Sequence, residues 1–382
     1  MNPTTFFIVI SIFLFNIIAL KIPVVLRRVT IGQYSENIYH FFFSKRYYFI
    51  LSILIVLFSV YAYYDTDYYH YETIYNLVRG DYLYQSHVEP IYIWFINHSF
   101  NSYSFFRFIV WGGALLLFGV LFRRIKQDND LTLSLFTLFF LLMFAYTRAS
   151  LGIAVFYVGV SFIVNPLKNK LINIFLIVLF LIGSCLFHKS MILLLAILPF
   201  TLLKLTTRKI LIFALIYPLG ILFINYLLKH LIVLLPYLND TMYTDTMQDY
   251  ISAMSVYNGI GAYLLNLLTR VPLYFVFFYL VYKINFKKNY LQLPPIILYF
   301  YKILFFVFYT ASIVYFINLG HKVLFYRILA MGCIPLIIVL GYLIQKGLIN
   351  KQLYYSLFIV VWVSCNCRVF YSLYLSLMNS LY

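Results

Sequence analysis

Residues 61–100 read YAYYDTDYYHYETIYNLVRGDYLYQSHVEPIYIWFINHSF and separate apolar runs on either side. Five of the chain's 11 acidic residues and three of its seven histidines fall in this stretch. Carboxylates and imidazoles are common acid and base groups in enzymes, so we expect the chemistry of the protein to lie here. The flanking apolar runs predict membrane-spanning helices, with this polar stretch outside the membrane.

The first half of the polar stretch predicts a short helix. Tyrosine and apolar positions recur at three- and four-residue spacing as far as Val78. Asp67 can cap the free amides of the first turn, and Gly80 ends the pattern.

The second half predicts another short helix. Ser86 and Glu89 have the spacing of a capping box ahead of the apolar run 91–100, which places Pro90 later than the first helical position that proline prefers. The run is about ten residues, roughly half of the 20 that a spanning helix needs. We therefore predict an interfacial or re-entrant helix with Glu89 at its mouth.

The composition is that of a membrane protein. Hydrophobic residues make up 64% of the chain and charged residues 10%, against about 25% charged in soluble domains. We predict an all-α polytopic protein forming one integral membrane domain over residues 1–382, with outer loops at 64–102 and 236–262. The net charge of +17 does not indicate a nucleic-acid partner, because lysine and arginine cluster between apolar runs.

About twelve apolar runs are candidate spans. They lie near 4–22, 47–63, 103–122, 131–147, 149–165, 171–187, 189–203, 210–235, 263–282, 296–317, 323–344 and 353–373. Short segments on every second connection hold 18 of the 28 basic residues, which assigns those connections to the cytoplasm and the polar stretch to the outer side.

Ten basic residues lie outside these inner segments, and all but Lys302 map to outer span ends or outer loops. They are Arg79, Arg107, Arg148, Lys189, Lys229, Arg270, Lys302, Lys322, Arg327 and Arg368. An arginine at membrane depth costs at least about 2.5 kcal/mol, so several on one side indicate a cationic cavity. The alternative is that each one snorkels to the interface. Arg148 and Arg327 stand out because Tyr146 and Tyr326 lie beside them.

His188 lies in the very short turn 185–190 between two spans, where it is either a functional group or a hydrogen-bonded turn residue. His321, six residues before Arg327, is a weaker candidate. Asp65 and Asp67 have the spacing of a metal-binding pair, but helix capping by Asp67 explains them equally well, so we predict no metal and no cofactor.

Four motifs in order resemble the bacterial O-antigen and exopolysaccharide polymerase family, the EpsG-like Wzy proteins. Asp67-x-x-x-Tyr71 followed by Glu89-Pro90-Ile91-Tyr92 is similar to that family's Asp-x-x-x-Tyr and Glu-Pro-x-aromatic motifs. The other three are Arg148 opening a small-residue span, the turn Phe187-His188-Lys189-Ser190-Met191, and Tyr326-Arg327-Ile328 in a late span. Alanine at position 149 departs from the family's usual glutamine. Gly159 follows Arg148 by eleven positions, an arginine–glycine spacing described for some of these polymerases.

The resemblance implies a GT-C-like, metal-independent inverting glycosyltransferase in the bacterial inner membrane, with its active face periplasmic. Such an enzyme moves a growing glycan from undecaprenyl pyrophosphate onto a lipid-linked repeat unit, so its partners are lipid-linked oligosaccharides and membrane lipid. A polysaccharide chain-length regulator is a further partner that the resemblance leaves open.

Three groups of residues are candidates for this chemistry. The catalytic base comes from His188, Glu89 or Asp67, each outward and beside a span end. Pyrophosphate contacts come from Arg148, Arg327 and, ranked lower, Arg270, since arginine binds phosphate oxygens with two parallel hydrogen bonds. The remaining candidates contact sugars and are Tyr71, Tyr92, Tyr146, Tyr326 and His321.

Two other classes stay open. A lipid-linked oligosaccharide flippase or other secondary transporter would also have about twelve spans and a basic cavity, but transporters carry charge through the midplane and often have an internal repeat. A membrane acyltransferase or a lumenal glycosyltransferase is the third reading.

Overall fold

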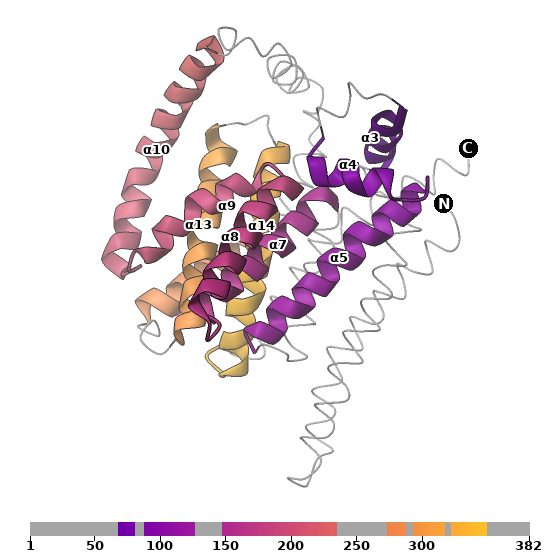
Figure 1. Ribbon diagram of the computed structural model, residues 1–382. Helices are drawn as coiled ribbons and strands as arrows, with labels where there is room; N and C mark the ends of the chain where they lie inside the picture. The colour runs from indigo at the N-terminus through magenta and orange to yellow at the C-terminus, as the bar shows by residue number, and fades with distance from the viewer. Residues whose placement is uncertain are drawn as a thin grey trace, which may run out of the picture. The chain divides into compact units, whose positions relative to one another are not determined.

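The computed structural model describes residues 68–80, 88–126, 147–234, 273–287, 293–317 and 322–349. These residues form helices and turns, with no strand among them, in agreement with the predicted all-α class (Figure 1). Side chains are described for a subset of these residues, namely 72–80, 88–126, 149–222, 273–287, 293–313 and 328–349.

Four described helices are long and apolar enough to cross a membrane, so the chain is a membrane protein with several spans. These segments are Tyr103–Arg124, Lys170–Phe187, Pro295–Ile313 and Ile328–Gln345. Three shorter apolar helices cover Ala149–Val164, Met191–Leu202 and Leu273–Phe286. The total of twelve stays a prediction, because the runs at 4–22, 47–63 and 353–373, and nearly all of 131–147, lie outside the described residues, as does the loop 236–262.

The chain divides into two compact units, residues 1–196 with 337–382, and residues 197–336. The first contains α3 (Tyr68–Gly80), α4 (Pro90–Asn97), α5 (Tyr103–Arg124), α7 (Thr147–Val164), α8 (Lys170–Phe187) and nearly all of α9 (Met191–Ile197). The second contains η2 (Leu198–Leu202), α10 (Thr207–Leu234), the π-helical turn η5 (Tyr282–Phe286) and α13 (Pro295–Ile317). Helix α14 (Lys322–Gln345) begins in the second unit and ends in the first.

Small residues on α7 allow α8 to pack closely against it. A Cβ atom added at Gly159 would lie 3.0 Å from the Cβ atom of Phe180, and one at Gly152 would lie 3.3 Å from that of His188. These glycines are seven residues apart, two helical turns, and therefore lie on one face. Close approach through small residues is a common means of helix association in membranes.

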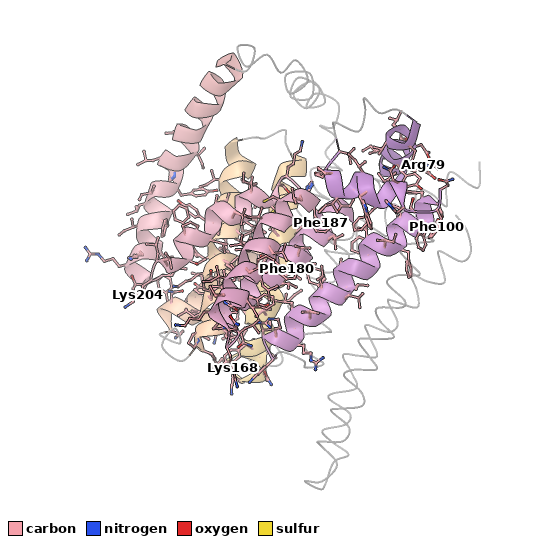
Figure 2. The ribbon with its side chains drawn as sticks, in the orientation of Figure 1. Arg79, Phe100, Lys168, Phe180, Phe187 and Lys204 are labelled. Carbon is pink, nitrogen blue, oxygen red and sulfur yellow. The ribbon has the colours of Figure 1, made fainter. Side chains whose placement is uncertain are left out.

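The end of α5 is tied to the end of α7. The Arg124 side chain donates from Nε to Ser161 Oγ over 2.8 Å and from Nη2 to the carbonyl oxygen of Asn165 over 2.6 Å. Asn165 Nδ2 donates back to the Arg124 carbonyl over 2.8 Å, and the guanidinium carbon lies 3.7 Å from the centre of the Phe162 ring. We call this end of the three helices the basic end, since α8 also begins here, just after Lys168 (Figure 2).

Helices α3 and α4 lie toward the other end of α5, where that helix starts (Figure 1). Tyr75 on α3 bonds to Ser99, just after α4, with 2.5 Å between the two hydroxyl oxygens. Its ring also packs on Tyr103 and Phe106 of α5, with centroids 5.4 and 5.7 Å away. Helix α3 ends at Gly80, as predicted.

Helix α4 begins differently from the prediction. Glu89 is its N-cap residue, Pro90 follows in the first turn, and the Glu89 side chain makes no capping hydrogen bond. The predicted capping box between Ser86 and Glu89 is therefore wrong, because proline is best tolerated at the first helical position and the helix starts there. At eight residues, about 12 Å, α4 is too short to span a membrane.

The run at 189–203, predicted as a span, is shorter than expected. Its α-helical part, α9, has seven residues and passes into the 3-10 turn η2, which has Pro199 in its first turn. Proline has no N–H to donate and its ring crowds the carbonyl four residues earlier, which ends α-helical pairing here.

In the second unit, Asn285 holds η5 to its neighbours. Its Nδ2 donates to the Leu205 carbonyl over 2.5 Å, its Oδ1 accepts from the Tyr301 hydroxyl, and its own carbonyl accepts from Thr207 Oγ1 over 3.1 Å. Lys302 is the one basic residue outside the inner segments that did not map to the outer side. It donates to the Thr201 carbonyl over 2.7 Å. Thr201 lies three residues before the basic segment that starts at Lys204.

Candidate functional site

The turn between α8 and α9 is built around His188. Its backbone N–H donates to the Ser184 carbonyl over 3.0 Å, and its own carbonyl accepts from the Met191 N–H over 2.9 Å. His188 is the C-cap residue of α8 in extended conformation, with φ −158° and ψ 120°, so its side chain leaves the helix end. The imidazole is fixed at its base by two backbone hydrogen bonds.

The His188 ring meets Glu89, which lies 99 positions earlier in the chain. The Nδ1 and Oε1 atoms are 3.0 Å apart, and each side chain is 7% exposed. Glu89 reaches this point from the start of α4, and His188 from the end of α8. Two of the three residues predicted as the catalytic base are thus in direct contact in a buried site.

Aromatic packing holds α4 against the end of α8. Phe187 lies beside α4 (Figure 2), with its ring centroid 6.4 Å from that of Tyr92 and 6.2 Å from that of Phe95. Tyr92 also packs on Phe106 of α5, at 6.1 Å. These contacts determine where Glu89 meets the α8–α9 turn.

Helix α7 lines another side of the same turn. A Cβ atom at Gly152 would approach Met191 Cγ to 3.2 Å and His188 Cβ to 3.3 Å. Arg148 precedes Gly152 by four residues, about one helical turn, and so occupies a position on the same face of α7, nearer the start of that helix. Gly159, eleven residues after Arg148, falls on this face as well. The arginine–glycine spacing therefore places both positions on the face of α7 that packs against α8.

Tyr92, predicted to contact sugar, is instead a packing residue. Its ring is fully buried among Phe95, Phe106 and Phe187, so it has no surface for a glycan to stack on. The chain has 39 tyrosines and 40 phenylalanines, so residue type alone does not distinguish an aromatic residue of the core from one that stacks on a sugar ring.

The other predicted residues are placed only in part. Tyr71 belongs to α3, Arg148 is the second residue of α7, and Tyr326 and Arg327 lie in the second turn of α14, but their side chains are outside the described set. Four more lie wholly outside the described residues and are Asp67, Tyr146, Arg270 and His321.

Arg107 was not ranked from the sequence and is the most deeply buried arginine among the described side chains. It is 1% exposed, with its guanidinium carbon 5.9 Å from the centre of the Tyr103 ring. It lies in α5 six residues before Gly113, whose added Cβ would lie 3.5 Å from Leu151 of α7. Since α5 and α7 run in the same direction, Arg107 lies toward the end of the group opposite Arg124. The sequence feature that could have singled out Arg107 is its position inside the apolar run 103–122.

Among the described side chains, no three histidine, cysteine, aspartate or glutamate residues gather as a metal site would require. The pair Asp65 and Asp67 lies outside the described residues. The acid–base contact of Glu89 with His188 is therefore the chemistry that the described part of the chain assembles.

These features define a helical membrane protein with a buried carboxylate–imidazole pair where two of its helix ends meet. The chain belongs to the EpsG family, whose model matches residues 45–379, and this family consists of polysaccharide polymerase-like membrane proteins. The resemblance inferred from the sequence motifs is thereby confirmed. No curated protein and no solved structure matches the chain.

Proposed function

We propose that this protein is an O-antigen or exopolysaccharide polymerase with a GT-C-like fold. It moves a growing glycan from undecaprenyl pyrophosphate onto a lipid-linked repeat unit at the periplasmic face of the bacterial inner membrane. Membership of the EpsG family supports the polymerase class. The observation that carries the proposal is the buried contact between Glu89 and His188, because it provides a base at a helix end.

The proposed transfer requires one base from the protein. An acceptor hydroxyl attacks the anomeric carbon from the side opposite the pyrophosphate, the carbon–oxygen bond to the pyrophosphate breaks, and the hydroxyl proton passes to a base. Undecaprenyl pyrophosphate leaves as the anion, so no paired acid is required. The proton acceptor belongs to the Glu89–His188 pair, with Asp67 as the third candidate.

The leaving pyrophosphate needs cations at the same depth. Arg148, Arg327 and Arg270 are the proposed contacts, since the planar guanidinium group can bond to two phosphate oxygens at once. The position of Arg148 supports its assignment, because Gly152, one turn further along the same face of α7, packs on His188.

The two ends of α8 support the proposed orientation in the membrane. Lys168 lies near one end of α8 and Phe187 near the other (Figure 2). The helix has 18 residues and is therefore about 27 Å long. That length is close to the thickness of a bilayer core, about 30 Å. The positive-inside rule supports a cytoplasmic location for the basic end and hence a periplasmic one for the Glu89–His188 pair.

Cysteine labelling of intact cells tests this orientation. Cysteines introduced at Asp81 and Lys287 should differ, with only the former reacting with an impermeant reagent from the periplasm. Asn101, exposed just before α5, and Lys168 form a second pair with the same expectation. Labelling of Lys287 or Lys168 alone would invert the orientation.

The function itself is tested with the purified protein in vesicles supplied with lipid-linked repeat units. A ladder of products, each longer by one repeat, is expected from a polymerase. In cells, disruption of the gene should leave the lipid A core capped by a single repeat unit. A core without any repeat, together with translocation of the lipid in vesicles and no ladder, would identify a flippase instead.

A further inference from the structure

We propose that the two members of the buried pair have different roles. His188 is the catalytic base, and Glu89 positions the imidazole and stabilises its protonated form. This inference rests on the proposed function and deepens it. The acceptor proton moves to Nε2 of His188, and Glu89 holds the other ring nitrogen.

The contact between Glu89 and His188 determines which ring nitrogen carries the proton. An ionised carboxylate can only accept a hydrogen bond, so Nδ1 of His188 donates to Oε1 of Glu89 over their 3.0 Å separation. A neutral imidazole has one N–H, and placing it on Nδ1 puts the basic lone pair on Nε2. The contact therefore selects the tautomer whose Nε2 can take a proton.

Glu89 is held at the start of α4 with its carboxylate on the imidazole. A carboxylate at a helix start commonly caps the free amides of the first turn, yet the Glu89 side chain makes no capping hydrogen bond and contacts His188 instead. The Glu89 carbonyl accepts from the N–H groups of Tyr92 and Ile93 over 2.9 and 3.2 Å, which holds the residue at the start of α4. The helix thus directs the carboxylate at the imidazole.

The carboxylate of Glu89 also stabilises the protonated form of His188. When Nε2 takes the acceptor proton, the imidazole becomes a cation in a site where both side chains are 7% exposed. An opposite charge 3.0 Å away stabilises that cation strongly, because little water screens the interaction. Glu89 therefore lowers the free energy of the state that forms during transfer, without touching the acceptor.

The surroundings of His188 limit its movement. Backbone hydrogen bonds fix the residue on both sides, and α7 passes so close at Gly152 that even a methyl group there would crowd the His188 Cβ. A base that is held in place before the substrate arrives needs little reorganisation during the reaction.

The test uses the whole protein in vesicles and compares His188→Asn, Glu89→Gln and the double variant. Asparagine retains an N–H donor near the place of Nδ1, so the His188→Asn variant should fold. It has no basic nitrogen, so its kcat should fall by about 10²–10⁴-fold. Glu89→Gln should lose less in kcat, with KM unchanged, because its amide oxygen still accepts from Nδ1. The double variant should be no slower than His188→Asn alone, because Glu89 acts through the histidine.

Chemical rescue separates this role from a structural one. Imidazole added to His188→Gly should restore part of the polymerisation rate, and the same addition to the His188→Gly, Glu89→Gln double variant should restore clearly less. Size-exclusion profiles of all variants check that they fold.

Three results would overturn the division of roles. They are a wild-type rate in His188→Asn, losses from the two single variants that multiply in the double variant, and equal rescue with and without Glu89. Failure of the proposed function is a separate outcome, since then the unmutated protein makes no ladder in the same vesicles.

Discussion

The two ends of the α5–α7–α8 group both contain polar side chains bonded across helices, but their partners differ. At the basic end, Arg124 donates to a hydroxyl and a backbone carbonyl, and Asn165 donates to another carbonyl. At the other end, the contact joins Glu89 to His188, two groups that can each gain or lose a proton. Backbone carbonyls close a helix end and do no chemistry, whereas a carboxylate facing an imidazole can move a proton. The kind of partner, more than burial, distinguishes the structural end from the candidate site.

The largest expected effect of an arginine substitution is at Arg148. Replacement by alanine should lower polymer formation by about 10²–10³-fold while the protein still inserts, because a phosphate contact formed in the transition state is lost. Arg148→Lys should recover part of the rate, since the charge remains but the planar fork does not. Product ladders from vesicles with equal amounts of protein measure both.

Arg123 supplies the matched control for that experiment. It is an exposed arginine at the basic end, and Arg123→Ala should leave the ladder unchanged. Equal losses at Arg123 and Arg148 would mean that the two ends do not differ in function.

A smaller effect is expected from Gly152→Ala. The new methyl group would lie 3.2 Å from Met191 Cγ and 3.3 Å from His188 Cβ, so the α8–α9 turn has to shift by a few tenths of an ångström. We expect about tenfold slower polymerisation, given that displacing a catalytic group by 1 Å can cost about 100-fold. The rate per folded molecule is the measurement.

Two other glycines on these helices separate crowding at the site from crowding elsewhere. Gly159→Ala meets Phe180 and Leu181 at 3.0 Å and should lower the free energy of unfolding by about 1–3 kcal/mol, with an unchanged rate per folded molecule. A Cβ atom added at Gly183 meets no described neighbour within 4 Å, so Gly183→Ala should alter neither quantity appreciably. A slower rate in the Gly159 variant would argue against a specific effect at Gly152.

Much of the helical framework could be predicted from the sequence. The runs at 103–122, 171–187 and 323–344 match α5, α8 and α14 to within two residues at each end, because an uninterrupted apolar run of this length has few alternatives to a spanning helix. Two predictions failed beside prolines: the capping box before α4 was wrong, and the span predicted at 189–203 was longer than the observed helix. Pro90 lies in the first turn of α4, and Pro199 ends the α-helical part of the run at 189–203.

The site was predictable as separate residues but not as a pair. Glu89 and His188 each stood out because carboxylates and imidazoles are rare in this chain. Their contact joins positions 99 residues apart and depends on how Phe187 packs on α4, which no local pattern contains. The burial of Tyr92 and Arg107 was hidden for the same reason, since tertiary packing decides which side of a helix is covered.

At the basic end, Arg124→Met should affect stability rather than rate. The variant loses three interactions, two hydrogen bonds and the contact with the Phe162 ring, while the methionine still fills apolar space. We expect unfolding to become easier by about 1–3 kcal/mol and the rate per folded molecule to stay the same. Thermal unfolding in detergent, followed by fluorescence, provides the first value and product ladders the second. A slower rate with unchanged stability would place function at this end too.

The smallest expected effect is at the bond between Tyr75 and Ser99, which joins α3 to the end of α4 on the side of the candidate site. Tyr75→Phe removes the 2.5 Å contact but keeps the ring against Tyr103 and Phe106. Because Ser99 Oγ also donates to the Ile96 carbonyl over 2.7 Å, the serine keeps one partner in the variant, and the loss should be about 1 kcal/mol. The bond does not involve Glu89 or His188, so the polymerisation rate should fall by less than about twofold. A loss of rate as large as that of Glu89→Gln would show that α3 helps to position α4 for catalysis, and that the structural and chemical parts of the molecule are not divided between the two ends.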